Sequence, residues 1–446
     1  MSFIPHSEAD RQEMLRTIGV SSEDELLAVV PEKFRRKEPL DVPPALSEWE
    51  AVETLQGIAN ESQHLICFAG AGYYDHYVPA VVDHLIRRSE FYTAYTPYQA
   101  EVSQGTLQAI YEFQSMVCEL MGLDVANASM YDGASAMAEA AMMARSIQRK
   151  RDKIVLSSTV NPHYRQVLDT YNLGLNIPIE IAPRADSGIT DLDALTGMID
   201  DQTAAVIVQS PNFYGLIEEL EAAAGVAHDK GALLIAVVDP VSLAILKSPG
   251  ECGADIAVAE GQPFGNGLSF GGPVLGLFAA RQDYIRHMPG RIVGASEDVD
   301  GRRGFVLTLQ TREQHIRREK ATSNICTNQG LCALAATVYL STVGKEGLRQ
   351  VAETSTQVAH YAFDRIVKET KLEPLFPGSP FFREFPLKTP GPAREIIWSG
   401  QDRGILPGVS LARFPHIDVD DGLLIAFTEK RSKKDVELLI EVLKEA

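Results

Sequence analysis

Three features are scarce in this sequence of 446 residues: cysteine, clustered positive charge and long apolar runs. The five cysteines form no CxxC pair and are odd in number, which argues against a disulfide framework and favours a reducing compartment. With 60 acidic and 41 basic side chains the net charge is −19, which argues against nucleic acid or an anionic membrane as a main partner. No apolar run reaches membrane length, and the polar, acidic start is unlike a secretory signal. We therefore expect a cytoplasmic protein.

The composition is that of a globular protein, with 45% hydrophobic and 23% charged residues. The length favours one large domain and a smaller one. Residues 1–64 differ from the rest, because short helical stretches alternate there with a charged, proline-rich link at 31–44. We predict an N-terminal helical arm. The arm either wraps a partner subunit or covers its own domain, and the sequence leaves both open.

Residues 65–310 carry the pattern of a doubly wound α/β domain. An amphipathic helix begins at Ser103, and a second follows Asp132, whose side chain can cap its free amides. Continuous apolar strands then alternate with helices, which predicts a mixed or mainly parallel sheet covered on both faces. The remaining segment, 311–446, predicts a linker helix and a small α+β domain. Its helices are expected near 328–342, 345–370 and towards the end of the chain.

Polar side chains follow the ends of the predicted strands, where open α/β sheets bind ligands. The helix start at Ser135 offers backbone amides and a hydroxyl for a phosphate. His163 can stack on a flat ring, and Asp239 can pair with a protonated ring nitrogen. This order suits pyridoxal phosphate, whose role as an electron sink needs a protonated pyridine.

Each of these residues also has a purely structural interpretation. A Gly-Ala-Ser sequence is a common helix cap, and a single histidine often belongs to a helix start or a core. An aspartate that ends a buried strand is often a turn former. The three together indicate the cofactor more strongly than any one alone.

The expected amine is missing from this pocket. An aldehyde cofactor is held as an imine by a lysine, yet the turn at 259–273 carries Gln262. Between Asp239 and Lys320 the only lysine is Lys247, which lies in a predicted crossover and away from a strand end. The sequence therefore predicts a vestigial cofactor pocket made of Ser135, His163, Asp239 and Gln262.

Two other motifs are set aside. Gly70-Ala71-Gly72 is similar to a dinucleotide loop, but the third glycine of that fingerprint would fall on Asp75. His76 and His84 are too far apart for a compact ligand pair on one helix face, so no metal site is predicted.

Several long segments of uncommon sequence resemble those of a known protein family. The segments AYTPYQAEVSQGTLQ (94–108) and REKATSNICTNQ (318–329) resemble the first, alpha subunit of two-subunit glycine dehydrogenase (decarboxylating), the P-protein of the glycine cleavage system. The resemblance extends over CFAGAGYYDHYVPA, ASMYDGASAMAEA and EGQPFGNGLSFGGP, and covers nearly the whole chain. It implies the aminotransferase-like, fold type I architecture of pyridoxal-phosphate-dependent transferases.

The resemblance also implies a division of labour. In the family, glycine condenses with pyridoxal 5'-phosphate and loses CO2, and its aminomethyl group passes to the lipoyl arm of the H-protein. The Schiff-base lysine belongs to the homologous beta subunit, so this chain is expected to be inactive alone. A heterotetramer with two copies of each subunit is implied.

The two strings then point to an active-site contribution in trans. Tyr95 and Tyr98 are phenols that can bind a substrate carboxylate or a phosphate, and Glu101 follows them. A second group of candidates lies just before a predicted helix start, where unpaired backbone amides can contact an anion. This group is Thr322, Ser323 and Asn324. Alternatively, both strings only hold the dimer together.

Three hypotheses follow: a subunit that completes a partner's active site, a purely structural scaffold, or an independent lyase that uses Lys247. A loop at 301–320 has a surplus of arginines that could attract an acidic carrier protein, although ordinary surface is an equal alternative. These are Arg302, Arg303, Arg312, Arg317 and Arg318.

Overall fold

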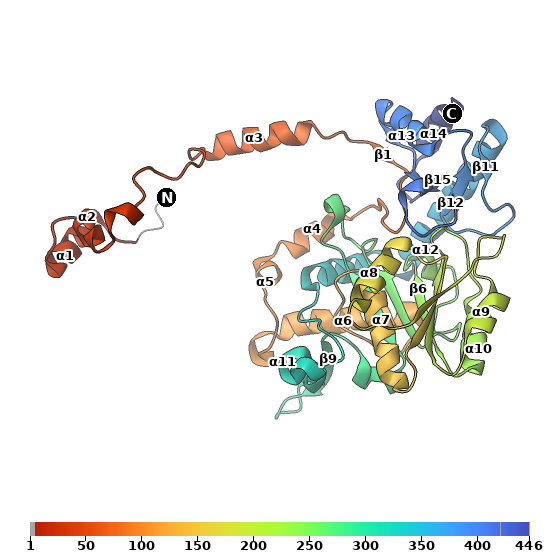
Figure 1. Ribbon diagram of the computed structural model, residues 1–446, viewed down its shortest axis with the longest axis horizontal. Helices are drawn as coiled ribbons and strands as arrows, with labels where there is room; N and C mark the ends of the chain where they lie inside the picture. Colours follow the sequence, from red (N-terminus) through yellow and green to blue (C-terminus); the bar gives the residue numbers. More distant parts are fainter. Residues whose placement is uncertain (1–4, 420, 446) are drawn as a thin grey trace. The chain divides into compact units, whose positions relative to one another are not determined.

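The computed structural model describes residues 5–419 and 421–445, so the first four residues of the predicted arm lie outside it. The chain divides into two compact units, one ending at Gln63 and the other beginning at His64 (Figure 1). The first unit has three α-helices, α1 (Glu8–Ile18), α2 (Glu23–Leu26) and α3 (Glu48–Asn60), among its described residues. Ser7 and Ser47 start α1 and α3 with capping boxes. No residue of α3 is buried.

The second unit is built on a seven-stranded sheet in the order β2-β8-β7-β6-β5-β3-β4. The pairs from β4 to β7 are parallel, whereas β8 runs antiparallel to both β7 and β2. The predicted mixed, mainly parallel sheet is therefore confirmed. Its strands are β2 (Val125–Ala126), β3 (Lys153–Ser157), β4 (Ile179–Ala182), β5 (Thr203–Ser210), β6 (Leu233–Val238), β7 (Ile256–Glu260) and β8 (Gly276–Ala280).

Alternate side chains of these strands enter two separate cores. Ile154, Ile207 and Ile235 pack with α7 (Gly133–Gln148) and α8 (Pro162–Asn172) on one face. Val206 and Leu234 pack on the other face. Helices α4 (Ala80–Ile86), α6 (Gln104–Met121), α9 (Leu192–Met198), α10 (Leu220–Asp229) and the first part of α12 (Gly330–Glu369) cover that second face. Because both faces are covered, the strands are apolar throughout.

Helix α7 begins where the sequence predicts. The side chain of Asp132 accepts a hydrogen bond from the amide of Ser135 at 2.7 Å, and the Ser135 hydroxyl accepts one from the Asp132 amide. Helix α7 packs against β5 to β8, so its first residues face the carboxyl end of β7.

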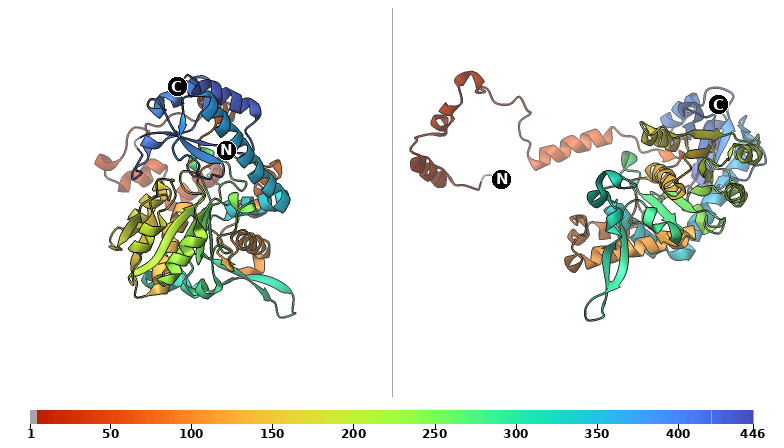
Figure 2. Two further views of the ribbon diagram at one scale, coloured as in Figure 1. Left: turned by 90° about the vertical axis from the view of Figure 1, so that its right-hand side faces the viewer. Right: turned by 60° about the horizontal axis from the view of Figure 1, so that its bottom comes forward.

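The C-terminal segment forms a four-stranded sheet in the order β11-β12-β15-β14, with its own apolar core (Figure 2, left, blue). Its strands and helices are β11 (Glu373–Pro374), β12 (Glu384–Lys388), α13 (Ala393–Asp402), β14 (Val409–Ser410), β15 (Leu423–Ala426) and α14 (Lys433–Leu443). Strand β1 (Ile66–Cys67) pairs with β13 (Ile405–Leu406). Helix α12 breaks at Gly344, where φ is 60°, which agrees with two helices predicted on either side.

One expectation was wrong. The predicted loop at 301–320 contains β10 (Arg303–Thr308), which pairs with β9 (Ile292–Glu297) in an antiparallel hairpin. Figure 2 (right) shows this hairpin extending outward from the body of the unit. A short helix, α11 (Gln314–Arg317), follows it. Among the described helices, none is long and apolar enough to cross a membrane.

Candidate functional site

A small cavity of about 40 Å³ lies at the carboxyl ends of β5, β6 and β7. Asp239 and Glu260 from the strand ends, Tyr74 from the glycine-rich segment, and Arg383 and Glu384 from the C-terminal sheet line it. This volume suits one or two water molecules, and a pyridine ring with a phosphate is far larger. Side chains of this chain fill the space that the predicted pocket would need.

Two of the first amides of α7, those of Gly133 and Ser135, already have partners. The Glu260 carboxylate accepts hydrogen bonds from the backbone amides of Gly133 (3.0 Å), Gln262 (2.9 Å) and Leu275 (3.1 Å). Burial raises the pKa of Glu260 to about 7, although these three amides act in the opposite direction. A Cβ atom added to Gly133 would lie 2.3 Å from the Tyr164 hydroxyl, so the helix start has no room for another group. An internal carboxylate therefore occupies the anion position that a phosphate would take.

The predicted partner of the ring nitrogen is also occupied. Oδ2 of Asp239 lies 2.5 Å from Nη2 of Arg383, a buried ion pair that lacks hydrogen-bond geometry. The Arg383 guanidinium stacks on Tyr74, 3.8 Å from the ring centroid, and its side chain is 1% exposed. The aspartate thus neutralises a cation of the chain itself.

A histidine continues this network. Nδ1 of His76 lies 2.6 Å from Glu429, while Nη1 of Arg383 donates to Nε2. Since an arginine can only donate, Nε2 must be the acceptor and Nδ1 carries the proton. Burial and then the nearby Arg383 lower the pKa of His76, which agrees with a neutral ring. Among the described residues no group of three or more His, Cys, Asp or Glu side chains could hold a metal ion.

Glu384 binds the glycine-rich segment. Its carboxylate accepts a hydrogen bond from the Ala71 amide at 2.7 Å and one from the Tyr74 hydroxyl at 2.8 Å. A Cβ atom at Gly70 would approach Glu384 to 2.2 Å, so glycine is required there. Burial raises the pKa of Glu384 to about 7. The string set aside as a dinucleotide loop therefore binds an internal carboxylate.

The four residues of the predicted vestigial pocket lie in different surroundings. Asp239 lines the small cavity, and Ser135 is buried in the α7 cap. Gln262 is buried, accepts from the Tyr74 amide at 3.2 Å and donates to the Asn266 carbonyl at 2.7 Å. His163 lies outside the cavity lining, exposed, with its ring 5.2 Å from that of Phe414.

Lys247 does not take the place of the missing amine. Its side chain is exposed, and its Nζ lies 3.0 Å from Glu221. The hydrogen bond to Glu221 raises the pKa of Lys247, whereas an imine-forming lysine needs a neutral amine. With its amine lacking, its anion position filled and its aspartate paired, the pocket does not fit pyridoxal phosphate.

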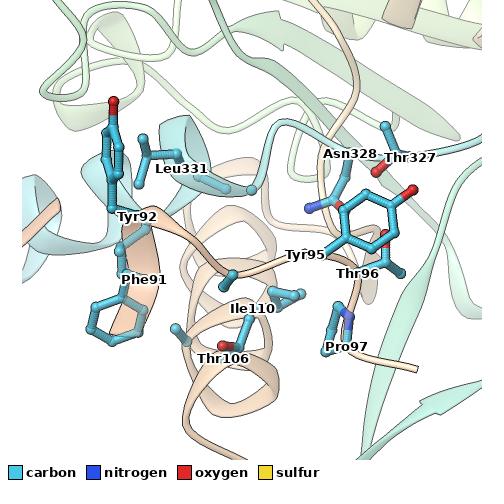
Figure 3. Close-up of a pocket in the computed structure, with 15 residues that line it drawn as sticks. Phe91, Tyr92, Tyr95, Thr96, Pro97, Thr106, Ile110, Thr327, Asn328 and Leu331 are labelled. Carbon is cyan, nitrogen blue, oxygen red and sulfur yellow. The ribbon is translucent and has the colours of Figure 1, made fainter. Parts of the chain in front are cut away.

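The two family-specific strings meet at another place. Residues around Tyr95 and Pro97 face Thr327 and Asn328 across a cavity of about 240 Å³ (Figure 3). The cavity is completed by Phe91 and Tyr92 of α5 (Ser89–Tyr92), by residues of α6 such as Thr106 and Ile110, and by the start of α12. Segments more than 200 positions apart in the sequence thus form one surface.

The candidates for a contribution in trans lie on and beside this surface. Tyr95 is 83% exposed and Tyr98 is 50% exposed, and Glu101 and Asn324 are exposed as well. Thr322 is half-buried. Of these candidates Tyr95 lines the cavity, whereas Tyr98, Glu101, Thr322, Ser323 and Asn324 do not.

Ser323 turns inward to a buried acid. The hydroxyls of Ser323 and of Tyr171, on α8, lower the pKa of Glu139 of α7, and the Ser323 hydroxyl also accepts a hydrogen bond from the Ile325 amide at 3.0 Å. Burial raises the pKa of Glu139 to about 7. Sequence analysis missed Glu139, Glu260, Arg383 and Glu384, although each is a charged residue within a strongly apolar run. A charged residue within an apolar run predicts a buried polar contact, but it does not predict which residue is on the other side of that contact.

The arginines at 301–320 do not form one cationic surface. Arg312 points inward and donates to the carbonyls of Met288 and Gly290. Arg303 covers Tyr111 and Phe305, at 5.9 and 5.2 Å from the ring centroids. Arg302, Arg317 and Arg318 are exposed.

Fold and site together define the class: a fold type I, pyridoxal-phosphate-transferase-like chain whose own cofactor pocket is filled. A solved glycine decarboxylase (P-protein) of the glycine cleavage system, in inhibitor-bound form, matches with a TM-score of 0.90 and 42% identity over 100% of both chains. At 13% identity, Lactobacillus brevis glutamate decarboxylase shares the fold alone, with a TM-score of 0.69 over 94% of this chain and 98% of the other.

The family model described as glycine cleavage system P-protein matches residues 1–443, so the chain belongs to that family. It is similar to the probable glycine dehydrogenase (decarboxylating) subunit 1 of Carboxydothermus hydrogenoformans, with 54% identity over 99% of both chains. The protein of the same description from Chlorobium limicola is 52% identical over 99% of both chains.

Proposed function

We propose that this chain is the lysine-lacking subunit of a two-subunit glycine decarboxylase. It would act with a homologous, lysine-bearing subunit that binds pyridoxal 5'-phosphate, and the assembly would transfer the aminomethyl group of glycine to the lipoyl H-protein. The proposal rests above all on the filled pocket, in which Glu260 and Arg383 take the positions of a phosphate and a ring nitrogen. A chain built in this way needs another subunit to hold the cofactor.

The role of this chain would be to complete the partner's site. Pyridoxal phosphate supplies an electron sink when it is bound to the partner. The exposed phenols of Tyr95 and Tyr98 would bind and orient a carboxylate, and Thr322 and Asn324 would contact an anion through a hydroxyl and an amide. Ser323, whose hydroxyl accepts a hydrogen bond from the Ile325 amide, would fix the turn between them and the helix. Glu101 would lie at the edge of this surface. The five thiols, which form no disulfide, support a reducing, cytoplasmic setting.

Reconstitution from separately purified subunits tests the proposal. Exchange between the glycine carboxyl group and labelled CO2 is measured with H-protein present, for each subunit alone and for the mixture. We expect exchange from the mixture and none from this chain alone. Exchange by this chain without its partner would refute the proposal, and so would full exchange by the partner without this chain.

A structural scaffold is the second candidate. The Tyr98 hydroxyl already accepts a hydrogen bond within the chain, from Arg291 at 3.0 Å, so its contact with substrate is not required by its chemistry. Substitutions at Tyr95 and Asn324, whose side chains are exposed, separate the two functions.

A further inference from the structure

A buried arginine ties the two family-specific strings to each other. Arg291 precedes β9, and its side chain is 3% exposed. Its Nη2 donates to the Tyr98 hydroxyl at 3.0 Å, and its Nη1 donates to the Thr327 hydroxyl at 2.9 Å. One guanidinium therefore bonds to the segment 94–108 with one nitrogen and to the segment 318–329 with another.

The ring of Tyr98 is fixed as well as its hydroxyl. The guanidinium carbon of Arg291 lies 5.4 Å from the Tyr98 ring centroid, within cation–π range. The ring of His315 meets Tyr98 edge-on, with centroids 6.1 Å apart. Tyr98 is half exposed, so these contacts set the orientation of a side chain whose outer face is free.

Further contacts fix the position of Arg291. Its backbone carbonyl accepts a hydrogen bond from the Ala128 amide at 2.8 Å, and Ala128 in turn accepts one from the Asn328 side chain at 3.0 Å. Glu313, also buried, lies 3.7 Å from Nε of Arg291, which is close enough for an ion pair but does not form a hydrogen bond. Glu313 thus balances the buried charge of Arg291, and the two terminal nitrogens of the guanidinium group donate to Tyr98 and Thr327.

A buried charge is costly, and a fold does not need one merely to join two loops. Arginine is suited to this place because its planar fork presents two donors at a fixed angle, which a lysine cannot do. We propose that Arg291 is a positioning residue, which sets Tyr98 and the segment around Thr327 in the geometry that the partner's substrate site requires. This inference rests on the function proposed above and adds a residue to it.

The test uses the assembled two-subunit enzyme with H-protein. Arg291→Gln removes the charged fork that reaches both hydroxyls at once, and Arg291→Lys keeps the charge without the fork. Tyr98→Phe and Thr327→Val each remove one hydrogen bond. The control is Arg286→Gln, an exposed arginine in the turn before β9. Glycine KM and kcat are measured together with the affinity between the subunits.

We expect Arg291→Gln to lower kcat/KM at least tenfold, mainly through KM for glycine, with subunit affinity unchanged within twofold. Arg291→Lys should restore little of the loss, and Arg286→Gln should resemble wild type. Tyr98→Phe in the Arg291→Gln background should cost less than it does alone, because the two residues act as one unit. Arg291→Gln/Glu313→Gln removes the buried pair as a whole, and should reproduce the loss if Arg291→Gln alone does not fold.

Wild-type kinetics in an assembled Arg291→Gln or Arg291→Gln/Glu313→Gln enzyme would overturn the positioning role. So would a loss of activity that follows the loss of subunit affinity, because Arg291 would then only hold the chains together. Failure of the proposed function looks different, since the wild-type mixture would then show no exchange that depends on this chain.

Discussion

The carboxylate of Glu260 accepts a hydrogen bond from the backbone amide of Gly133, the first residue of α7, at 3.0 Å. The positive end of a helix dipole commonly attracts an external anion. Here the anion comes from the end of a neighbouring strand, and it also caps the amides of Gln262 and Leu275. The pocket lacks a lysine and also a free place for a phosphate.

A lysine alone should therefore not restore cofactor binding. We predict that Gln262→Lys, in the isolated chain with added pyridoxal phosphate, gives no visible absorption band of a lysine-bound cofactor. The reason is that Glu260 and Arg383 still occupy the positions of the phosphate and the ring nitrogen. The proposed lysine-bearing partner subunit serves as the positive control. A visible band that borohydride abolishes irreversibly, leaving the reduced cofactor covalently attached to the Gln262→Lys chain, would contradict the prediction.

The buried ion pair between Asp239 and Arg383 should be needed for stability. Asp239→Asn leaves a buried arginine without its counter-charge, so we expect the free energy of unfolding to fall by about 3–5 kcal/mol. Asp239→Asn/Arg383→Met removes both charges and should recover part of that loss. Denaturant unfolding of the isolated chain measures both, and Asp283→Asn, at an exposed aspartate, is the control. Equal stability of Asp239→Asn and wild type would show that the pair is dispensable.

The stability of the chain should depend on pH through Glu384. Burial raises the pKa of this carboxyl from 4.5 to about 7 in the folded chain. A raised carboxyl pKa stabilises the fold fully below the unfolded value, and this contribution is lost as the pH rises through 7. Glutamine resembles the protonated form at every pH and keeps an acceptor for the Ala71 amide.

The stability of Glu384→Gln relative to wild type should therefore increase by roughly 2–3 kcal/mol between about pH 5 and pH 8. Chemical unfolding at a series of pH values measures this difference, and Glu373→Gln, at an exposed glutamate, is the control. A difference that stays constant or falls with rising pH would show that Glu384 is ionised throughout.

Substitutions at Tyr95 and Asn324 should distinguish a subunit that completes the partner's active site from a purely structural scaffold. Both side chains are exposed, so Tyr95→Phe and Asn324→Ala should leave folding and assembly intact. If they contact substrate or cofactor in the partner's site, glycine–CO2 exchange should fall tenfold or more, equivalent to about 1.4 kcal/mol in the barrier. Tyr361→Phe, on α12, controls for loss of a phenol elsewhere. Wild-type exchange in both assembled variants would favour the scaffold.

Local rules explain what the sequence predicts well. Strands buried on both faces must be apolar throughout, so β3, β5, β6 and β7 are visible as continuous runs. Asp132 is a strong helix cap, and it fixes the start of α7 within one residue. The carboxyl ends of parallel strands converge, which places Asp239 and Glu260 at one cavity.

Contacts between distant segments explain what the sequence could not reveal. Arg383, the residue before β12, reaches Asp239 from 144 positions further on, and the pairing depends on how the C-terminal sheet packs. His163 follows Asn161, whose side chain caps the His163 amide, and this start of α8 leaves the imidazole exposed beside Phe414. The hairpin from β9 to β10 has partly exposed, mixed residues, so its pattern is weak.

The filled pocket also limits how such a protein can change over generations. Restoring a phosphate site requires the loss of Glu260, restoring a ring site requires the loss of Arg383, and each single step leaves a buried donor or charge unsatisfied. Chains with only one of these changes would be less stable than the present chain. The packing of the pocket thus makes the lack of a cofactor site difficult to reverse by single substitutions.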